Sequence, residues 1–228
     1  MDMFAPIPET SALQRGRGRT AATAAALRRA STISFYDDNA DDYAATTMAI
    51  DTAERIARFA ALLPRGGRVL DAGCGAGRDL IGFGAAGLRP EGLDISPSLA
   101  AIARRNSKMP VKVGDLRDPP FAPNTFDGIW AMASLLHLEP GEVRDALGRL
   151  GELLVPGGVL FASVKRGGGF ARDDDGRWFA LHDEAGWTKH LQAAGLDVIE
   201  IVGEPPASDA GTGSVAPGWI SSLARRPK

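Results

Sequence analysis

The stretch "RVLDAGCGAGRDL", Arg68–Leu80, constrains the fold of this chain more than any other part of its sequence. An apolar run that ends at Asp71 leads into three glycines, Gly73, Gly75 and Gly77, at alternate positions. Glycine has no Cβ atom, so it adopts positive φ angles easily and lets a ligand lie against the main chain. We therefore predict a buried strand, a bare turn that binds a ligand, and a helix that begins directly after the turn.

Strand and helix patterns alternate along the rest of the chain. Short apolar runs predict further strands at "EGLDI", "VKVGD", "FDGIWAMAS" and "VLFASVK". Helical spacing predicts helices through Ile56, through Phe83, after an N-cap at Ser96, and over 143–154. Five strand-then-helix units in series predict an α/β fold with a parallel sheet covered by helices on both faces. Ligands bind such sheets at the carboxyl ends of the strands.

The length and composition predict one soluble domain. With 228 residues, 44% of them hydrophobic, the chain can bury one sizeable core. Residues 1–30 differ from the rest, because 10–34 contain arginine and many small residues but no acidic residue. We predict a flexible Arg/Ala-rich tail over 1–30 and a folded domain over 31–228. A transit peptide and an arm that contacts phosphate are the alternatives for this tail.

Charge, hydropathy and cysteine content limit the classes of partner, metal site and cellular compartment that we expect for this protein. A formal net charge of -2 gives no overall attraction to nucleic acid or to an anionic membrane surface. No apolar run approaches the roughly 20 residues of a membrane-spanning helix. The single cysteine, Cys74, cannot form an internal disulfide or a structural zinc site, so we expect a cytoplasmic protein without a metal. The sequence leaves the oligomeric state open.

Three carboxylates end three successive predicted strands. Asp94 lies 23 residues after Asp71, and Asp115 lies 21 residues after Asp94. A pyrophosphate site would use the spacing G-x-G-x-x-G, and a carboxylate in front of it would repel phosphate. Here the spacing is G-x-G-x-G, and Asp71 is the carboxylate in front of the loop, which favours a ligand that carries positive charge at this point. S-adenosylmethionine fits, because it has an ammonium group, a sulfonium, a ribose diol and an adenine but no phosphate.

At these residues the sequence resembles the class I S-adenosylmethionine-dependent methyltransferases. The motifs "LDAGCGAGRD", "GLDISPSLA", "VGDLRDPPF", "FDGIWAMASLLHL" and "LVPGGVLFASVK" follow one another in the order typical of that family. Within the family the chain looks most like small bacterial proteins similar to tellurite-resistance methyltransferases. The resemblance implies a Rossmann-like three-layer sandwich whose seven-stranded sheet ends in an antiparallel strand, here "GWISSLARR" after "LDVIEIV". It also implies methyl transfer from S-adenosylmethionine to an acceptor, for which we predict a small molecule.

The resemblance also implies a set of cofactor-binding residues. Asp94 is expected to accept hydrogen bonds from the ribose hydroxyls, and Asp115 a hydrogen bond from the adenine amino group. The predicted cofactor-binding residues are Tyr36, Asp71, Ala72, Gly73, Gly75, Asp94, Ile95, Asp115, Leu116 and Ala131.

The chemistry asks little of the protein, because an in-line displacement at an activated methyl group depends mainly on proximity and orientation. A neutral acceptor would also need a base, and His137 in "SLLHL" is our candidate; a structural or substrate-shaping role is the alternative. Tyr36 and Tyr43 are predicted to form a lid over the site or to pack on the sheet edge. Lys165 and Arg166 could bind an anionic acceptor or lie in a solvated loop.

The cation Arg78 directly after the last glycine is unfavourable at the start of a helix. We therefore predict an ion pair between Arg78 and an acid of the segment "YDDNADD", rather than contact with a ligand. Three other functions stay open. They are a cofactor-binding module without catalysis, a nicotinamide-dependent oxidoreductase, and a nucleic-acid methyltransferase. A nucleic-acid methyltransferase would be expected to carry an Asn/Asp-Pro-Pro-aromatic tetrapeptide at the end of the fourth strand, but this chain has "AMASLLH" there.

Overall fold

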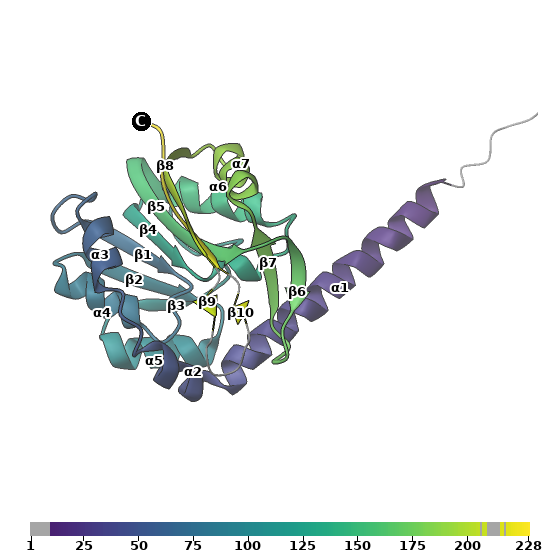
Figure 1. Ribbon diagram of the computed structural model, residues 1–228, viewed down its shortest axis with the longest axis horizontal. Coiled ribbons are helices and arrows are strands. Elements are labelled where there is room, and N and C mark those ends of the chain that lie inside the picture. The colour runs from purple at the N-terminus through teal and green to yellow at the C-terminus, as the bar shows by residue number, and fades with distance from the viewer. Residues whose placement is uncertain (1–9, 206, 209–214, 217) are drawn as a thin grey trace, which may run out of the picture.

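A mostly parallel sheet forms the centre of the computed structural model, which describes residues 10–205, 207–208, 215–216 and 218–228 (Figure 1). Side chains are described for residues 22–205 and 218–228. The main strands are β1 (Arg68–Ala72), β2 (Arg89–Asp94), β3 (Val111–Val113), β4 (Phe126–Met132), β5 (Leu154–Arg166), β8 (Asp197–Glu204) and β11 (Trp219–Arg225). Their order in the sheet is β3-β2-β1-β4-β5-β11-β8.

The strand directions confirm the predicted sheet. Strands β1 to β5 run parallel to one another, and β11 runs antiparallel to both of its neighbours, β5 and β8. The predicted series of strand-then-helix units is wrong at one step, because residues 114–125, all of them described, contain turns and no helix. Pro119, Pro120 and Pro123 explain this difference, since proline lacks the N–H group that a helix interior uses.

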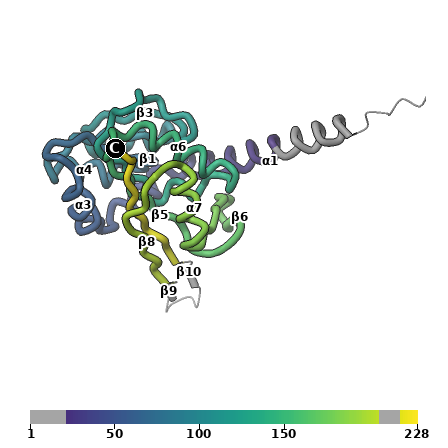
Figure 2. The backbone as a smooth tube through the Cα atoms, turned by 90° about the horizontal axis from the view of Figure 1, so that it is seen from above, coloured from purple at the N-terminus to yellow at the C-terminus, as the bar shows by residue number. Residues whose placement is uncertain are grey.

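Helices cover both faces of the sheet (Figure 2). One face carries α3 (Ala53–Ala60), α4 (Arg78–Ala85) and α5 (Pro97–Ser107), and the other carries α6 (Val143–Leu153) and α7 (Glu184–Ala193). On the first face the fully buried Trp130 ring stacks on Phe161 at 3.9 Å and meets the edges of Phe59 and Phe83. The second face buries a leucine-rich cluster under α6 and α7. These two cores fix the strand ends that carry the predicted site.

A long helix, α1 (Thr10–Asp38), precedes the domain, and α2 (Ala40–Thr47) follows after a break at Asn39. In Figure 1 the N-terminal part of α1 extends away from the body of the protein. The predicted boundary between residues 30 and 31 falls inside this helix. The flexible character that we predict for residues 1–30 stays a prediction, and residues 1–9 lie outside the described part of the chain.

A β-hairpin stands where the sequence predicted a loop after β5. Strands β6 (Gly169–Arg172) and β7 (Trp178–His182) pair antiparallel, and β7 also pairs with the end of β5. The C-terminal half of α1 is bonded to this hairpin: Ser31 Oγ donates to Gly176 O at 2.8 Å, and Trp178 N donates to Thr32 Oγ1 at 3.0 Å. The remaining elements are the short pair β9 (Ala207–Ser208) and β10 (Val215–Ala216), and the 3-10 helix η1 (Leu135–His137).

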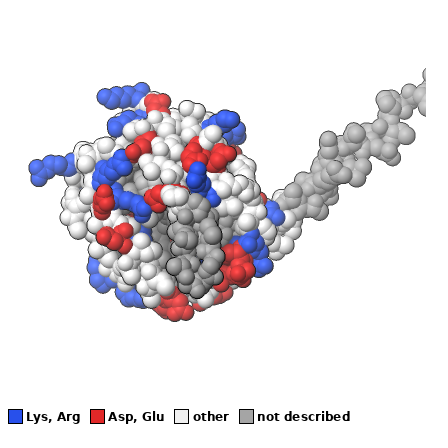
Figure 3. Space-filling view, viewed as in Figure 1, with Lys and Arg blue, Asp and Glu red and all other residues white. Residues whose placement is uncertain are grey.

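Acidic and basic side chains are interspersed over the face of the protein seen in Figure 3, in keeping with the small net charge. Among the helices that the structure describes, none has the length and apolar character required to cross a membrane. The prediction that neither nucleic acid nor a membrane is a partner of this protein rests on its net charge and on the hydropathy of its sequence.

From the position of β11 in the sheet we predict how one substitution changes the stability of the protein. Ser222 is buried and accepts a hydrogen bond from Trp187 Nε1 at 3.0 Å, whereas its neighbour Ser221 points to the other face of the sheet. S222A leaves the buried indole N–H without its acceptor, so we expect a loss of roughly 1 to 3 kcal/mol in the free energy of unfolding. Chemical denaturation measures it, with S221A as the control. Equal losses in the two variants would contradict the position of this strand.

Candidate active site

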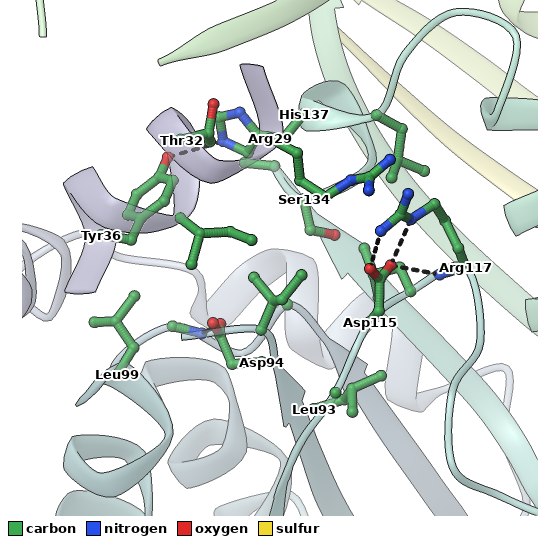
Figure 4. A pocket seen from close by; sticks show the side chains of 18 of the residues that line it. Arg29, Thr32, Tyr36, Leu93, Asp94, Leu99, Asp115, Arg117, Ser134 and His137 are labelled. Carbon is green, nitrogen blue, oxygen red and sulfur yellow. Dashed lines mark hydrogen bonds and ion pairs between the residues drawn. The ribbon is translucent and has the colours of Figure 1, made fainter. Parts of the chain in front are cut away.

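A pocket lies at the carboxyl ends of the parallel strands (Figure 4). It encloses about 800 Å³ of empty space, including the open solvent at its mouth. Figure 4 shows Asp94 and Asp115 on the strand side of the pocket, with Tyr36 and His137 on the opposite side. The pocket therefore has a floor built by strand ends and a roof built by α1, α2 and η1.

The floor depends on hydrogen bonds from main-chain N–H groups to the side-chain carboxylate of Asp94. Gly75 N donates to Asp94 Oδ2 at 2.8 Å, and Ser96 N donates to Asp94 Oδ1 at 2.9 Å. Both carboxylate oxygens are thus held in place by backbone N–H groups, and each keeps a further lone pair. The oxygens of Asp94 can therefore accept hydrogen bonds from a diol in the pocket.

The three alternating glycines have different structural roles. All three have positive φ angles. A Cβ atom on Gly73 would stand 2.3 Å from Ser134 Cβ, and one on Gly77 would stand 3.0 Å from the Ala103 backbone, so protein packing requires both glycines. A Cβ atom on Gly75 would meet only Tyr43, at 3.6 Å, and would project into the space that a ligand would use. This bare wall beside a carboxylate fits the ribose and methionine parts of S-adenosylmethionine.

Burial raises the pKa of Asp94, which is part of the floor, and of Asp71, which lies beneath it. The main-chain N–H bonds from Ser96 and Gly75 act in the opposite direction on the pKa of Asp94. The pKa of Asp71 is raised well above its usual value by burial and then by the nearby Asp79 carboxylate. A positively charged ligand group near Asp71 would favour its ionised form.

Arg78 lies beside these acids and forms an ion pair with its neighbour Asp79. Arg78 Nε and Nη2 donate to the two Asp79 oxygens at 2.7 and 2.8 Å. Asp79 also accepts hydrogen bonds from Thr52 Oγ1 and Trp130 Nε1. The predicted partner of Arg78, an acid of "YDDNADD", is therefore wrong. The carboxylate at the next position makes the two-pronged contact that a guanidinium favours.

A chain of charged groups joins the floor to the roof at the other end of the pocket. Arg117 N and Nε donate to Asp115 Oδ1 at 2.9 Å, and Arg117 Nη2 pairs with Asp115 Oδ2. Burial alone would raise the pKa of Asp115, but the bonds from Arg117 outweigh it and hold this pKa below the usual value. Glu142 Oε1 then accepts from both Arg117 Nη1 at 2.9 Å and Arg29 Nη2 at 2.7 Å.

Three rings form the part of the roof above the glycine turn. The Tyr36 and Tyr43 rings meet edge to face with centroids 5.0 Å apart, and the Tyr36 ring meets the His137 ring at 5.3 Å. All three side chains line the pocket. Burial raises the pKa of both tyrosines, so their hydroxyls stay protonated at neutral pH. The predicted lid and the predicted packing role are both compatible with these contacts.

The two hydrogen-bond partners of His137 define which of its ring nitrogens carries the proton. Nδ1 lies 2.8 Å from Trp178 O, which can only accept, so Nδ1 carries the proton. Nε2 lies 2.8 Å from Tyr36 Oη and therefore accepts from that hydroxyl. Burial lowers the pKa of His137 to about 4, and the nearby cations Arg177 and Lys165 contribute in the same direction. The imidazole is neutral at pH 7, with its one lone pair directed at Tyr36.

The structure brings most of the predicted cofactor residues together and places three of them below the pocket. Tyr36, Gly73, Gly75, Asp94, Ile95, Asp115 and Leu116 line the pocket. Asp71, Ala72 and Ala131 are buried in the strands beneath it. The Ala72 carbonyl nevertheless positions a lining residue, because it accepts from Ser134 Oγ at 2.6 Å.

The predicted substrate residues divide in the same way. Tyr43 and His137 line the pocket, whereas Lys165 and Arg166 do not. The Lys165 ammonium stands 3.5 Å from the centroid of the Phe179 ring, and Arg166 pairs with Glu184 at 3.0 Å. This placement does not support acceptor binding by either residue.

Several residues that line the pocket were not predicted from the sequence, among them three on α1 that share a face with the predicted Tyr36. Their spacing on α1, at i, i+3, i+4 and i+7, was the signal that could have found them. The lining residues that were missed include Arg29, Thr32, Ile33, Leu99, Arg117, Ser134 and Leu138.

Comparisons with known proteins agree with this geometry. Residues 69–158 match a family model described as a methyltransferase domain. The chain is 32% identical over 104 residues to O-methyltransferase rstn1 of Aspergillus nomiae, a match that covers 42% of this chain and 45% of the relative. It is 36% identical over 93 residues to magnesium-protoporphyrin O-methyltransferase of Rhodobacter capsulatus, covering 38% and 41%. The chain thus spans less than half the length of these curated relatives.

A solved structure matches over the whole chain. It is 1,6-didemethyltoxoflavin-N1-methyltransferase of Burkholderia thailandensis with bound 1,6-didemethyltoxoflavin and S-adenosylhomocysteine. The TM-score is 0.68 at 23% identity, and the match covers 100% of this chain and 94% of that one. The protein therefore has the Rossmann-like fold of class I S-adenosylmethionine-dependent methyltransferases, and S-adenosylmethionine is the cofactor that fold and site support. The likeness to tellurite-resistance methyltransferases stays a prediction.

The lowered pKa of His137 predicts how stability depends on pH. In the unfolded chain a histidine has a pKa near 6.5, against about 4 in the fold. Between these values the unfolded chain binds a proton that the folded protein does not, so the free energy of unfolding falls as pH drops from 6.5 towards 4. Denaturant unfolding at pH 7 and pH 5 should show that H137Q loses roughly 2 kcal/mol less than the wild type over this interval.

The less enclosed His190 offers a control, because its pKa is also lowered by burial and H190Q should change the pH dependence less. Identical pH dependence in the wild type and H137Q would show that the His137 ring is not held neutral by its surroundings.

Proposed function

We propose that this protein transfers a methyl group from S-adenosylmethionine to a small-molecule acceptor. The observation that carries the proposal is the floor of the pocket, where the bare main chain of Gly75 meets the Asp94 carboxylate at 2.8 Å. The match of residues 69–158 to a methyltransferase domain supports it. Two relatives named as O-methyltransferases support an oxygen atom as the methyl acceptor.

The residues of the floor would hold the cofactor. Asp94 would accept from the ribose hydroxyls, Asp115 would accept from the adenine amino group, and the Gly75 main chain would lie against the ligand. The cofactor supplies an activated methyl group on a sulfonium. Tyr36 and Tyr43 would exclude water from the reacting atoms, and the protein's main contribution is to hold the donor and the acceptor in line.

The Tyr36–His137 pair offers a route for the acceptor's proton. An acceptor hydroxyl would donate to a free lone pair of Tyr36 Oη. As the new carbon–oxygen bond forms, the hydroxyl proton becomes strongly acidic and passes to Tyr36 Oη, whose own proton passes to His137 Nε2. The Nδ1–H bond to Trp178 O holds the ring in the required tautomer and stabilises the imidazolium. His137 is then a base that acts through Tyr36, and a pKa of about 4 is sufficient for this acidic proton.

A labelling experiment tests the proposed function. The protein is incubated with a metabolite extract and donor that carries an isotope label in its methyl group, and mass spectrometry identifies the labelled product. Formation of S-adenosylhomocysteine together with one methylated metabolite is the expected result. Tight cofactor binding without turnover across many extracts would favour a binding module, and binding of a nicotinamide dinucleotide in place of S-adenosylmethionine would favour an oxidoreductase.

Asp94→Ala should weaken S-adenosylmethionine binding by roughly 1 to 3 kcal/mol, because the variant removes the acceptor for two ribose hydroxyls. Calorimetric titration measures this dissociation constant. D197A, a change at an exposed acid on β8, is the matched control and should bind as the wild type does. An unaltered constant in D94A would mean that the cofactor does not lie on this floor.

The proton route predicts a dependence on the acceptor. With a hydroxyl acceptor, Y36F and H137Q should each lower kcat by roughly 10²- to 10⁴-fold. With an acceptor that is already an anion, such as a thiolate, both variants should keep wild-type kcat. Equal losses with the two kinds of acceptor would assign these residues to positioning alone.

A further inference from the structure

Arg117 lies in the turn after β3, at the end of the pocket that the proposed function assigns to adenine, and that function gives it no role. It stands two residues after Asp115, and both residues line the pocket. Figure 4 shows the Arg117 guanidinium beside the Asp115 carboxylate, joined to it by dashed lines. The proposed partner of the adenine amino group is therefore a carboxylate that already binds a cation.

The hydrogen bonds from Arg117 leave one acceptor position on the Asp115 carboxylate. A carboxylate has about four lone pairs, two on each oxygen. Oδ1 accepts from Arg117 N and Nε, both at 2.9 Å, so both of its lone pairs are used. Among the residues whose side chains the structure describes, Oδ2 accepts from Arg117 Nη2 alone. One lone pair of Oδ2 is therefore available to a ligand.

Arg117 is itself held in this position, because Nη1 donates to Glu142 Oε1 at 2.9 Å. The same Glu142 oxygen accepts from Arg29 Nη2 of α1 at 2.7 Å, so the charged groups around Asp115 are two arginines and the glutamate that binds both. Burial acts to raise the pKa of Asp115, but the bonds from Arg117 and the charge of Arg29 bring this pKa below its usual value of about 4. The carboxylate is therefore ionised at pH 5.5 and above, where it can only accept.

Adenine and its deaminated form, hypoxanthine, differ in the group that would meet this lone pair. Adenine carries an amino group, which donates, whereas hypoxanthine carries a carbonyl oxygen at the same ring position, which accepts. An ionised carboxylate accepts from the amino group and repels the carbonyl oxygen, whereas a protonated carboxyl group could donate to that oxygen. A site that pairs with one base and leaves the other unpaired discriminates strongly between them. Selectivity for adenine therefore requires that Asp115 carries no proton.

We propose that Arg117 is a positioning residue that makes Asp115 an obligate hydrogen-bond acceptor and thereby selects adenine over hypoxanthine. The inference rests on the proposed function and adds the residue that determines base selectivity at the same site. Without the guanidinium, a bound cofactor would cover a carboxylate that has lost its two-pronged cationic partner. Such a burial is costly, so the carboxylate takes up a proton more easily and could donate to the hypoxanthine carbonyl.

Calorimetric titration with S-adenosylhomocysteine and S-inosylhomocysteine tests the inference. The two ligands differ only in the base, so an effect common to both cancels in the ratio of their dissociation constants. We expect the wild type to prefer the adenine ligand by roughly tenfold or more at both pH 8 and pH 5.5. R117M keeps the main-chain bond to Asp115 but removes the guanidinium, so its preference should fall by roughly threefold or more from pH 8 to pH 5.5 as Asp115 binds a proton.

Two further variants accompany R117M. Arg104 Nε and Nη2 donate to Val111 O at 2.9 and 2.6 Å, so Arg104 supports the other end of β3 and does not line the pocket. R104Q is therefore the matched control, and it should keep the wild-type preference at both pH values. D115N tests the acceptor itself. Its amide can both donate and accept, so its preference should be about onefold at both pH values.

Four results would overturn the inference. They are a wild type that binds both ligands but prefers neither, an R117M variant whose preference is as independent of pH as that of the wild type, an R104Q variant with the pH dependence expected of R117M, and a D115N variant that keeps the wild-type preference. If R117M does not fold or does not bind, R117Q replaces it with the same expectation, because glutamine carries no charge. A wild type that binds neither ligand would instead overturn the proposed function, and the inference with it.

Discussion

The hydrogen bond from Gly75 N to the Asp94 carboxylate is the contact on which the site depends. It joins the turn after β1 to the end of β2, and so it brings the glycine motif and the second acid into one floor. Gly75 can donate in this way because the turn has a positive φ angle that glycine adopts without strain. Asp94 can remain buried because Gly75 N and Ser96 N satisfy both of its oxygens. The neighbouring glycines serve packing, which leaves Gly75 as the member of the motif whose missing Cβ atom opens space for a ligand.

The roof is assembled from segments that are far apart in the sequence. Tyr36 comes from α1, His137 from η1, and the carbonyl that orients His137 belongs to Trp178 of β7. The hairpin β6–β7 holds α1 through Ser31 and Thr32, so the hairpin both orients the histidine and supports the helix above it. This arrangement encloses the imidazole enough to lower its pKa, while the Tyr36 side chain lines the pocket.

The floor and the roof of the pocket differ in the chemical groups that they offer a ligand. The floor offers carboxylates and bare main chain, which suit a cofactor with hydroxyls, an amino group and a positive charge. The roof offers aromatic rings, aliphatic side chains and the guanidinium of Arg29. Glu142 joins the two halves, because one of its oxygens binds both Arg29 of the roof and Arg117, which holds Asp115 of the floor. The ion pairs at this end therefore fix the distance between the two walls.

The resemblance to a known family implied the antiparallel β11, whereas the sequence alone determined the strands β1 to β5 and the acids that end the first three strands. It could do so because strand periodicity, glycine spacing and N-caps are local properties, and parallel strands place their carboxyl ends together. It did not determine the hairpin after β5, the partner of Arg78, or the distance of Lys165 and Arg166 from the pocket. Only the tertiary structure decided that Arg29, Tyr36, His137 and Trp178 meet above the floor. Contacts across more than a hundred residues depend on how α1 packs, and no local pattern encodes that packing.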